Sequence, residues 1–228
     1  MDERRRAPGL ALPHPRDLLN ALALITRLPL PRPPIADRQF AKAALFFPLI
    51  GLAAGALLAW TWRSLAVGPP PWTTALALTL LWEGIGVPTG RGRAAFNVAL
   101  LVTALLAKAY LLSASGALTG MALLFAPVLG RWSLVVLAVG ARSATRSGQK
   151  FSPAVTFREF GIASLLALGL VFTLAELLGL LLIVVCAAAT LLLRLAFHRW
   201  QGGITWPTVV AGLHVVEIAA LSVTALVG

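Results

Sequence analysis

The chain contains 228 residues, 59% of them hydrophobic, and its mean hydropathy is +0.88. A soluble domain of this length has too little interior to bury so much apolar surface, so the composition excludes a water-soluble globular fold. The net charge of +11 would suggest a nucleic-acid partner in a soluble protein, but here most basic residues lie in short loops between apolar runs. That pattern is typical of membrane proteins, so we expect the lipid bilayer, and no nucleic acid, as the partner of these charges.

Residues 1–42 are predicted to form a cytoplasmic N-terminal arm that contains one interfacial amphipathic helix. Apolar side chains recur at helical spacing between residues 17 and 28, at Leu18, Leu19, Leu22, Ile25 and Leu28. Asp17 is suited to cap this helix and Pro29 to end it. The segment is too short to cross a bilayer, so we expect it to lie on the membrane surface with Arg16 and Arg27 near lipid phosphates.

Residues 43–228 are predicted to form an all-α, polytopic transmembrane bundle. A backbone exposed to lipid must satisfy its own hydrogen bonds, so each apolar run of bilayer length is expected to be a helix. The seven predicted spans are 43–62, 72–89, 96–114, 118–140, 160–176, 179–197 and 206–227. Six or eight spans also fit the sequence, because residues 176–179 leave room only for a tight turn and the second span contains Glu83. Gly51 and Gly55 predict a close approach of two helices.

The distribution of basic residues predicts the orientation of the bundle. Four segments hold 15 of the 19 Lys and Arg residues, at 1–42, 90–95, 141–159 and 198–205. Basic residues gather on the cytoplasmic side of membrane proteins, so we expect the N-terminus there and the C-terminus, after an odd number of spans, on the opposite side.

Several ionisable side chains fall at membrane depth, where an isolated charge costs at least about 2.5–3.5 kcal/mol. Glu83, Lys108, Arg131 and Glu217 are the candidate functional residues among them. Each would be explained either by an ion pair, Glu83 with Lys108 and Glu217 with Arg131, or by a polar cavity. His214 and Glu217 share a helical face, so with Glu83 they are candidates for metal ligands.

Two motifs stand in order near the start of the chain. They are residues 25–31, Ile-Thr-Arg-Leu-Pro-Leu-Pro, and residues 46–52, Phe-Phe-Pro-Leu-Ile-Gly-Leu, followed by Gly55. This pattern resembles the start of cobalamin synthase, also called adenosylcobinamide-GDP ribazoletransferase. Further similarities are Leu106-Ala107-Lys108, Gly130-Arg131, and Gly202-Gly203-Ile204-Thr205 with Glu217 downstream.

The resemblance implies a multi-pass protein of the bacterial inner membrane. That family joins adenosylcobinamide-GDP to α-ribazole or its 5′-phosphate, releases GMP, and uses a divalent metal, Mg²⁺. It also implies that Arg27, Gly202, Gly203 and Thr205 bind substrate. If the chain is active, the resemblance therefore implies corrinoid and nucleotide substrates.

One family feature is missing from this sequence. The family carries an acidic block of the form His-x-Asp-Gly-x-x-Asp-x-x-Asp-Gly after the second span, followed by an Asp-Ser-Arg element. Here Glu83 is followed by no Asp or Glu until Glu159, Trp206-Pro207 replaces a Gly-Asp pair, and His214 replaces a glutamate. Because Mg²⁺ is held mostly by carboxylate oxygens, we expect its ligands to be missing and catalysis to be impaired or repurposed.

Three functions are open on this basis. The first is a divergent transferase that still performs the family reaction. The second, which we favour, is a non-catalytic paralogue: a scaffold or accessory subunit of a membrane complex that binds a tetrapyrrole or a lipid. The third is a small transporter whose path is lined by the intramembrane charges.

Overall fold

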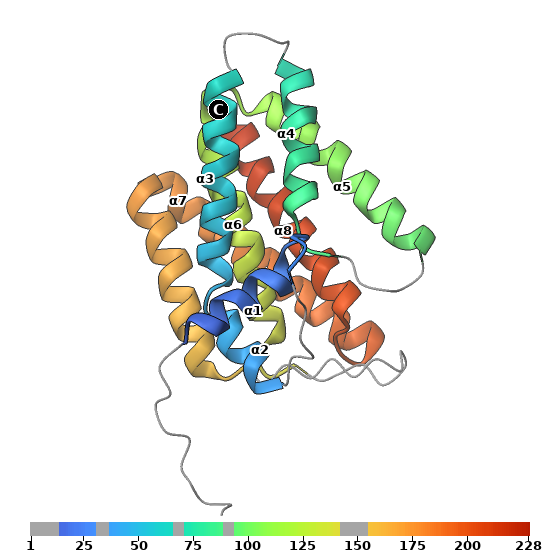
Figure 1. Ribbon diagram of the computed structural model, residues 1–228. Coiled ribbons are helices and arrows are strands. Elements are labelled where there is room, and N and C mark those ends of the chain that lie inside the picture. The colour runs from blue at the N-terminus through green and yellow to red at the C-terminus, as the bar shows by residue number, and fades with distance from the viewer. Residues whose placement is uncertain (1–13, 31–36, 66–70, 89–93, 142–154) are drawn as a thin grey trace, which may run out of the picture.

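The computed structural model describes residues 14–30, 37–65, 71–88, 94–141 and 155–228, and every regular element in these ranges is a helix (Figure 1). The predicted all-α class is confirmed for this part of the chain. The basic segments expected at 90–95 and 141–159 lie largely outside the described residues. The helices are α1 (Pro15–Ile25), α2 (Asp37–Ala44), α3 (Phe47–Leu65), α4 (Pro71–Ile85), α5 (Ala94–Ala114), η1 (Gly116–Leu118), α6 (Thr119–Ala138), α7 (Phe157–Gln201) and α8 (Trp206–Val227).

Three helices of the described ranges are long and apolar enough to cross a bilayer: Gly116–Ala138, Phe157–Gln201 and Trp206–Val227. Large apolar side chains on α7 face outward, with Leu165 and Leu177 exposed by 76% and 80%. An outer surface this apolar is unfavourable in water and favourable in lipid. These features are those of a membrane helical bundle.

Helix α6 is the centre of the bundle. Nearly all of its side chains are buried, and it contacts α3, α7 and α8. In Figure 1 it runs behind α3, with α7 and α8 on its two sides. Any side chain that α6 turns toward α8 is therefore enclosed by protein.

The predicted close approach of helices at Gly51 and Gly55 is confirmed. A β-carbon built on Gly51 would lie 2.6 Å from the Pro127 carbonyl oxygen, and one on Gly55 would lie 2.4 Å from the Leu124 carbonyl oxygen. Both glycines of α3 thus bring its backbone into direct contact with the backbone of α6. This contact fixes α6 in the middle of the bundle.

The ends of several predicted spans were wrong. The helix within the first predicted span, α3, begins at Phe47 instead of residue 43, because residues 37–44 form the separate helix α2, which the apolar pattern did not predict. The helix within the second predicted span, α4, ends at Ile85 instead of residue 89. There Gly86 N–H donates to the Glu83 carbonyl oxygen in a tight turn (3.2 Å), and Pro88 has no N–H with which to continue a helix.

The helix predicted to lie on the membrane surface forms as α1, but its ends differ from the predicted ones. Its N-cap is His14 rather than Asp17, and the Asp17 carboxylate accepts a hydrogen bond from the His14 N–H at 2.9 Å. It ends at Ile25 because Thr26 is extended and its hydroxyl donates to the Leu22 carbonyl oxygen. Buried residues of α1, such as Ile25, belong to one apolar cluster with residues of α2, α6 and α8.

Helix α7 folds back on itself at Glu176, as the predicted turn near residues 176–179 required. The Glu176 backbone has φ 47° and ψ −119°, a conformation that favours glycine. A β-carbon on Gly179 would lie 2.4 Å from the Val171 carbonyl oxygen, although residues eight apart in a straight helix are about 12 Å apart. The limbs 157–175 and 177–201 therefore form a hairpin, which Figure 1 shows in orange.

Replacing Glu176 with glycine is expected to stabilise the protein by about 1 kcal/mol. A non-glycine residue in such a conformation costs about 1–3 kcal/mol of strain, which glycine removes. The greater conformational entropy of glycine in the unfolded chain offsets part of this gain. Thermal unfolding in detergent measures the change. Glu176 is exposed, so Glu176→Gln removes its charge and leaves the backbone as it is. If Glu176→Gln raised the unfolding temperature as much as Glu176→Gly, the effect would come from the charge, and the explanation by backbone strain would be wrong.

The charge of Arg194, which falls within the sixth predicted span, is explained by its contacts with the end of α6. Its guanidinium donates to the carbonyl oxygens of Val136 and Val139, both at 2.6 Å. The last carbonyl groups of a helix have no partner within the helix. Arg194 therefore satisfies the end of α6 from the second limb of α7.

Candidate functional site

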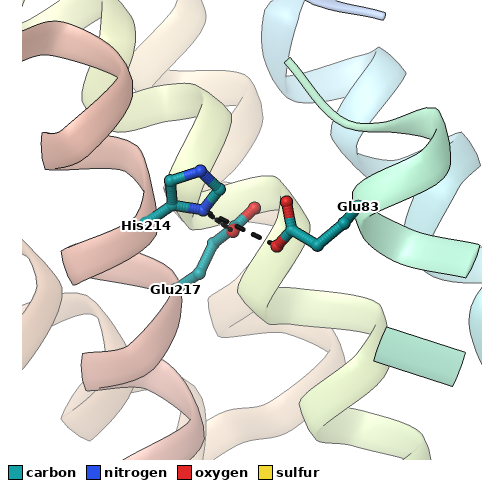
Figure 2. A group of neighbouring side chains, drawn as sticks. All are labelled: Glu83, His214 and Glu217. Carbon is teal, nitrogen blue, oxygen red and sulfur yellow. Dashed lines mark ion pairs between the residues drawn. The ribbon is translucent and has the colours of Figure 1, made fainter. Parts of the chain in front are cut away.

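Five ionisable side chains from four helices meet in the interior of the bundle. Glu83 comes from the last turn of α4, Lys108 from α5, Arg131 from α6, and His214 and Glu217 from α8. None is more than 5% exposed. We refer to these five residues as the buried charge cluster. Figure 2 shows three of them, Glu83, His214 and Glu217, pointing toward one another from α4 and α8.

Lys108 is at the centre of the buried charge cluster. Its Nζ atom lies 2.5 Å from Glu83 Oε1 and 3.2 Å from His214 Nδ1, and it donates a further hydrogen bond to Glu217 Oε2. The same atom lies 4.5 Å from the centre of the Trp82 ring, within the range of a cation–π interaction.

Glu217 is held on several sides. The Trp82 indole donates to Glu217 Oε1 at 3.2 Å, and Arg131 Nη1 lies 3.9 Å from the same oxygen. Its aliphatic part packs on Gly130, where a β-carbon would lie 2.5 Å from Glu217 Cγ. The glycine before Arg131 therefore provides the space in which this carboxylate sits.

The charges of the cluster balance. Two carboxylates face one ammonium and one guanidinium, so with neutral His214 the sum is zero. Charges removed from water are tolerated when they are paired and hydrogen-bonded. The two predicted pairs, Glu83 with Lys108 and Glu217 with Arg131, are thus confirmed as contacts. Lys108 joins them into one network because it also contacts Glu217.

The residues present do not fit a magnesium ion. Donor atoms of Glu83, His214 and Glu217 lie within 4.8 Å of one another, close enough to share a cation, but Lys108 Nζ contacts all three of these residues. Magnesium takes oxygen ligands in octahedral geometry, and an imidazole nitrogen suits transition metals better. Adding a divalent ion would also place four positive charges against two carboxylates.

Among the described residues, the hydrogen bonds and ion pairs of this cluster do not involve the substrate-binding candidates. Gly202 has φ 70° and caps the end of α7, buried Gly203 follows it, and Thr205 caps the start of α8 by accepting a hydrogen bond from the Thr208 N–H. At 1.5 Å per residue, Thr205 lies about 18 Å from Glu217 along the axis of α8. Arg27 is half-buried just beyond α1. Their role in binding substrate stays a prediction.

Sequence reasoning missed the part played by Trp82. This side chain is 1% exposed, and it contacts both Glu217 and Lys108. The available signal was its position directly before Glu83, a glutamate within a long apolar run. Its partners lie on α5 and α8, however, and no local pattern identifies them.

Comparison with known proteins identifies relatives along most of the chain. The family model described as cobalamin-5-phosphate synthase matches residues 17–86 and 92–225. The adenosylcobinamide-GDP ribazoletransferase of Stutzerimonas stutzeri is 30% identical over an alignment of 236 residues, which covers 90% of this chain and 95% of the relative. The protein of the same name from Geotalea daltonii is 28% identical over 220 residues, with 84% and 89% covered. No solved structure gives a significant match.

Proposed function

The chain belongs to the cobalamin-5-phosphate synthase family, and on this premise we propose that it is a membrane protein of cobalamin biosynthesis in which the family's transfer reaction is impaired or replaced. One observation carries the proposal: Glu83 and Glu217 are already paired with Lys108. No other Asp or Glu follows Glu83 until Glu159. The family match is interrupted between residues 86 and 92, in the region where the family resemblance implies the acidic block. Transfer at a phosphate needs positive groups or a metal that is free to meet the developing charge.

The test is GMP release from adenosylcobinamide-GDP in the presence of α-ribazole and saturating Mg²⁺. We expect the purified chain to release GMP at least about 100-fold more slowly than the Geotalea daltonii relative assayed alongside it. The loss of one electrostatic contact to the transition state typically lowers the rate by about this factor. Magnesium-dependent release at a comparable rate would refute the proposal and would establish the family reaction for this chain.

The alternative is an active transferase in which cations of the chain replace the metal. The presence of both Lys108 and Arg131 in one site favours it, since each is a fixed positive charge. In that case GMP release persists in EDTA and is abolished by Lys108→Met. The same assay with chelator therefore separates the two possibilities.

As a non-catalytic member, the chain would act as a subunit of a membrane assembly that binds a tetrapyrrole or a lipid. The exposed apolar face of α7 supports this reading, because Leu165 and Leu177 require lipid or protein contacts. Purification in mild detergent tests it. Co-purified protein or pigment is the expected result, and a monodisperse single chain without either would argue against the assembly.

We further propose seven spans in the bacterial inner membrane with a cytoplasmic N-terminus. The two limbs of α7, together with α3, α4, α5, α6 and α8, supply the spans. The 15 residues of α4 extend only about 22 Å, which is less than the roughly 30 Å thickness of a hydrocarbon core. In this arrangement Glu83, in the last turn of α4, lies below the membrane surface. Cysteine labelling from either side of the membrane tests the orientation.

A further inference from the structure

The Lys108 ammonium has a partner for each of its hydrogen atoms. An ammonium group carries three N–H donors. Three acceptors surround it: Glu83 Oε1, Glu217 Oε2 and His214 Nδ1. The Trp82 ring lies on a further side. The ammonium is therefore coordinated by protein in the way a small cation would be. Figure 2 shows the three side chains that accept from it.

These acceptors belong to the residues that would hold a metal ion. Glu83, His214 and Glu217 are the described group whose ligand atoms lie within 4.8 Å of one another. The ion-pair distances use the same atoms, with His214 Nδ1 lying 3.7 Å from Glu83 Oε1 and 3.6 Å from Glu217 Oε2. A metal ion bound by these atoms would occupy the position that the Lys108 ammonium holds.

A second observation comes from the far side of the imidazole. Because His214 Nδ1 accepts from Lys108, the proton of a neutral ring is on Nε2. His214 Nε2 is buried, and no hydrogen-bond partner is found for it in the part of the chain that the structure describes. A metal-ligating histidine nearly always donates its other N–H to a carboxylate or carbonyl group that orients the ring. His214 is thus held from its Lys108 side, as a partner of the ammonium.

We propose that Lys108 is a tethered cation that excludes divalent metal ions from Glu83, His214 and Glu217, and that its removal converts these residues into a divalent-metal site. Two carboxylates and one imidazole form a ligand set suited to manganese or zinc. This inference rests on the proposed function, because it explains how a member of this family would hold these side chains together without a metal ion. Metal binding alone tests it, and no measurement of turnover is needed.

The test measures Mn²⁺ binding to the full chain in detergent by electron paramagnetic resonance. We expect Lys108→Ala to bind one Mn²⁺ at least about 100-fold more tightly than the wild type, since a unit positive charge next to a divalent ion is strongly repulsive in a protein interior. Lys108→Ala/Glu217→Gln lacks one ligand and is expected to lose that binding. Arg63→Ala removes a positive charge from an exposed position and is expected to leave Mn²⁺ binding at the wild-type level.

Two results would overturn the inference. One is a wild-type protein that binds Mn²⁺ as tightly as Lys108→Ala, with Glu217→Gln abolishing the binding. The other is a folded Lys108→Ala protein that gains no affinity. If Lys108→Ala does not fold, the wild-type protein provides the test. Mn²⁺ binding by the wild type that is lost in Glu217→Gln would refute the inference, and a wild type that binds no Mn²⁺ at this cluster would support it. Magnesium-dependent GMP release without metal at this cluster would refute the proposed function alone.

Discussion

Gly55→Ala is expected to destabilise the protein by about 3 kcal/mol or to prevent its accumulation in the membrane. The new β-carbon would lie 2.4 Å from the Leu124 carbonyl oxygen and 2.9 Å from the Leu123 carbonyl oxygen. Both are backbone atoms of the central helix, so neither can rotate away, and α3 must move off α6. Overpacking of this kind typically costs about 1–3 kcal/mol, and more where the backbone cannot relax.

Gly169→Ala is the matched control. Gly169 also lies within a helix, α7, but a β-carbon there meets no atom within 4 Å. Alanine is favoured over glycine in a helix by about 1 kcal/mol, so this variant is expected to gain stability. Thermal unfolding in detergent compares the two, and a gain at both positions would contradict the described contact between α3 and α6.

Lys108→Met is expected to cost about 3–5 kcal/mol of stability, because it leaves Glu83 and Glu217 buried with Arg131 as the single remaining cation of the cluster. Adding Glu83→Gln removes one of these carboxylates and restores a net charge of zero. The double variant is therefore expected to be more stable than Lys108→Met, and the coupling energy of the double-mutant cycle is expected to be about 1–3 kcal/mol.

The control for this cycle is Arg63→Met, which removes an exposed cation and is expected to change stability by less than about 0.5 kcal/mol. Additive effects of Lys108→Met and Glu83→Gln, with no coupling between them, would mean that the two side chains are not paired in the folded protein.

Hydropathy and residue type predicted the helices because, in lipid, the backbone has almost no alternative. The break at residues 176–179 could be placed because two bilayer-length runs cannot form one straight span. The end of α4 could not, since the apolar run continues to Val87 while the helix stops at Ile85. Helix α2 was missed because its sequence carries no long apolar run.

The ion pairs could be predicted from cost alone, since a buried charge needs a partner. Which partner it takes depends on how α4, α5, α6 and α8 are rotated about their axes, and the sequence holds no local signal for that. Two candidate pairs therefore became one network centred on Lys108. In the sequence, Gly130 stands out only as part of the family resemblance, and nothing there indicates that its missing side chain makes room for Glu217.

The most direct test of Lys108 as the resident cation is an experimental structure of the full chain determined in the presence of Mn²⁺, with an anomalous difference map at the manganese edge. We expect the Lys108 ammonium to lie between Glu83, Glu217 and His214, with no manganese peak among them. A manganese peak bonded to the two carboxylates, with Lys108 turned away, would contradict the account.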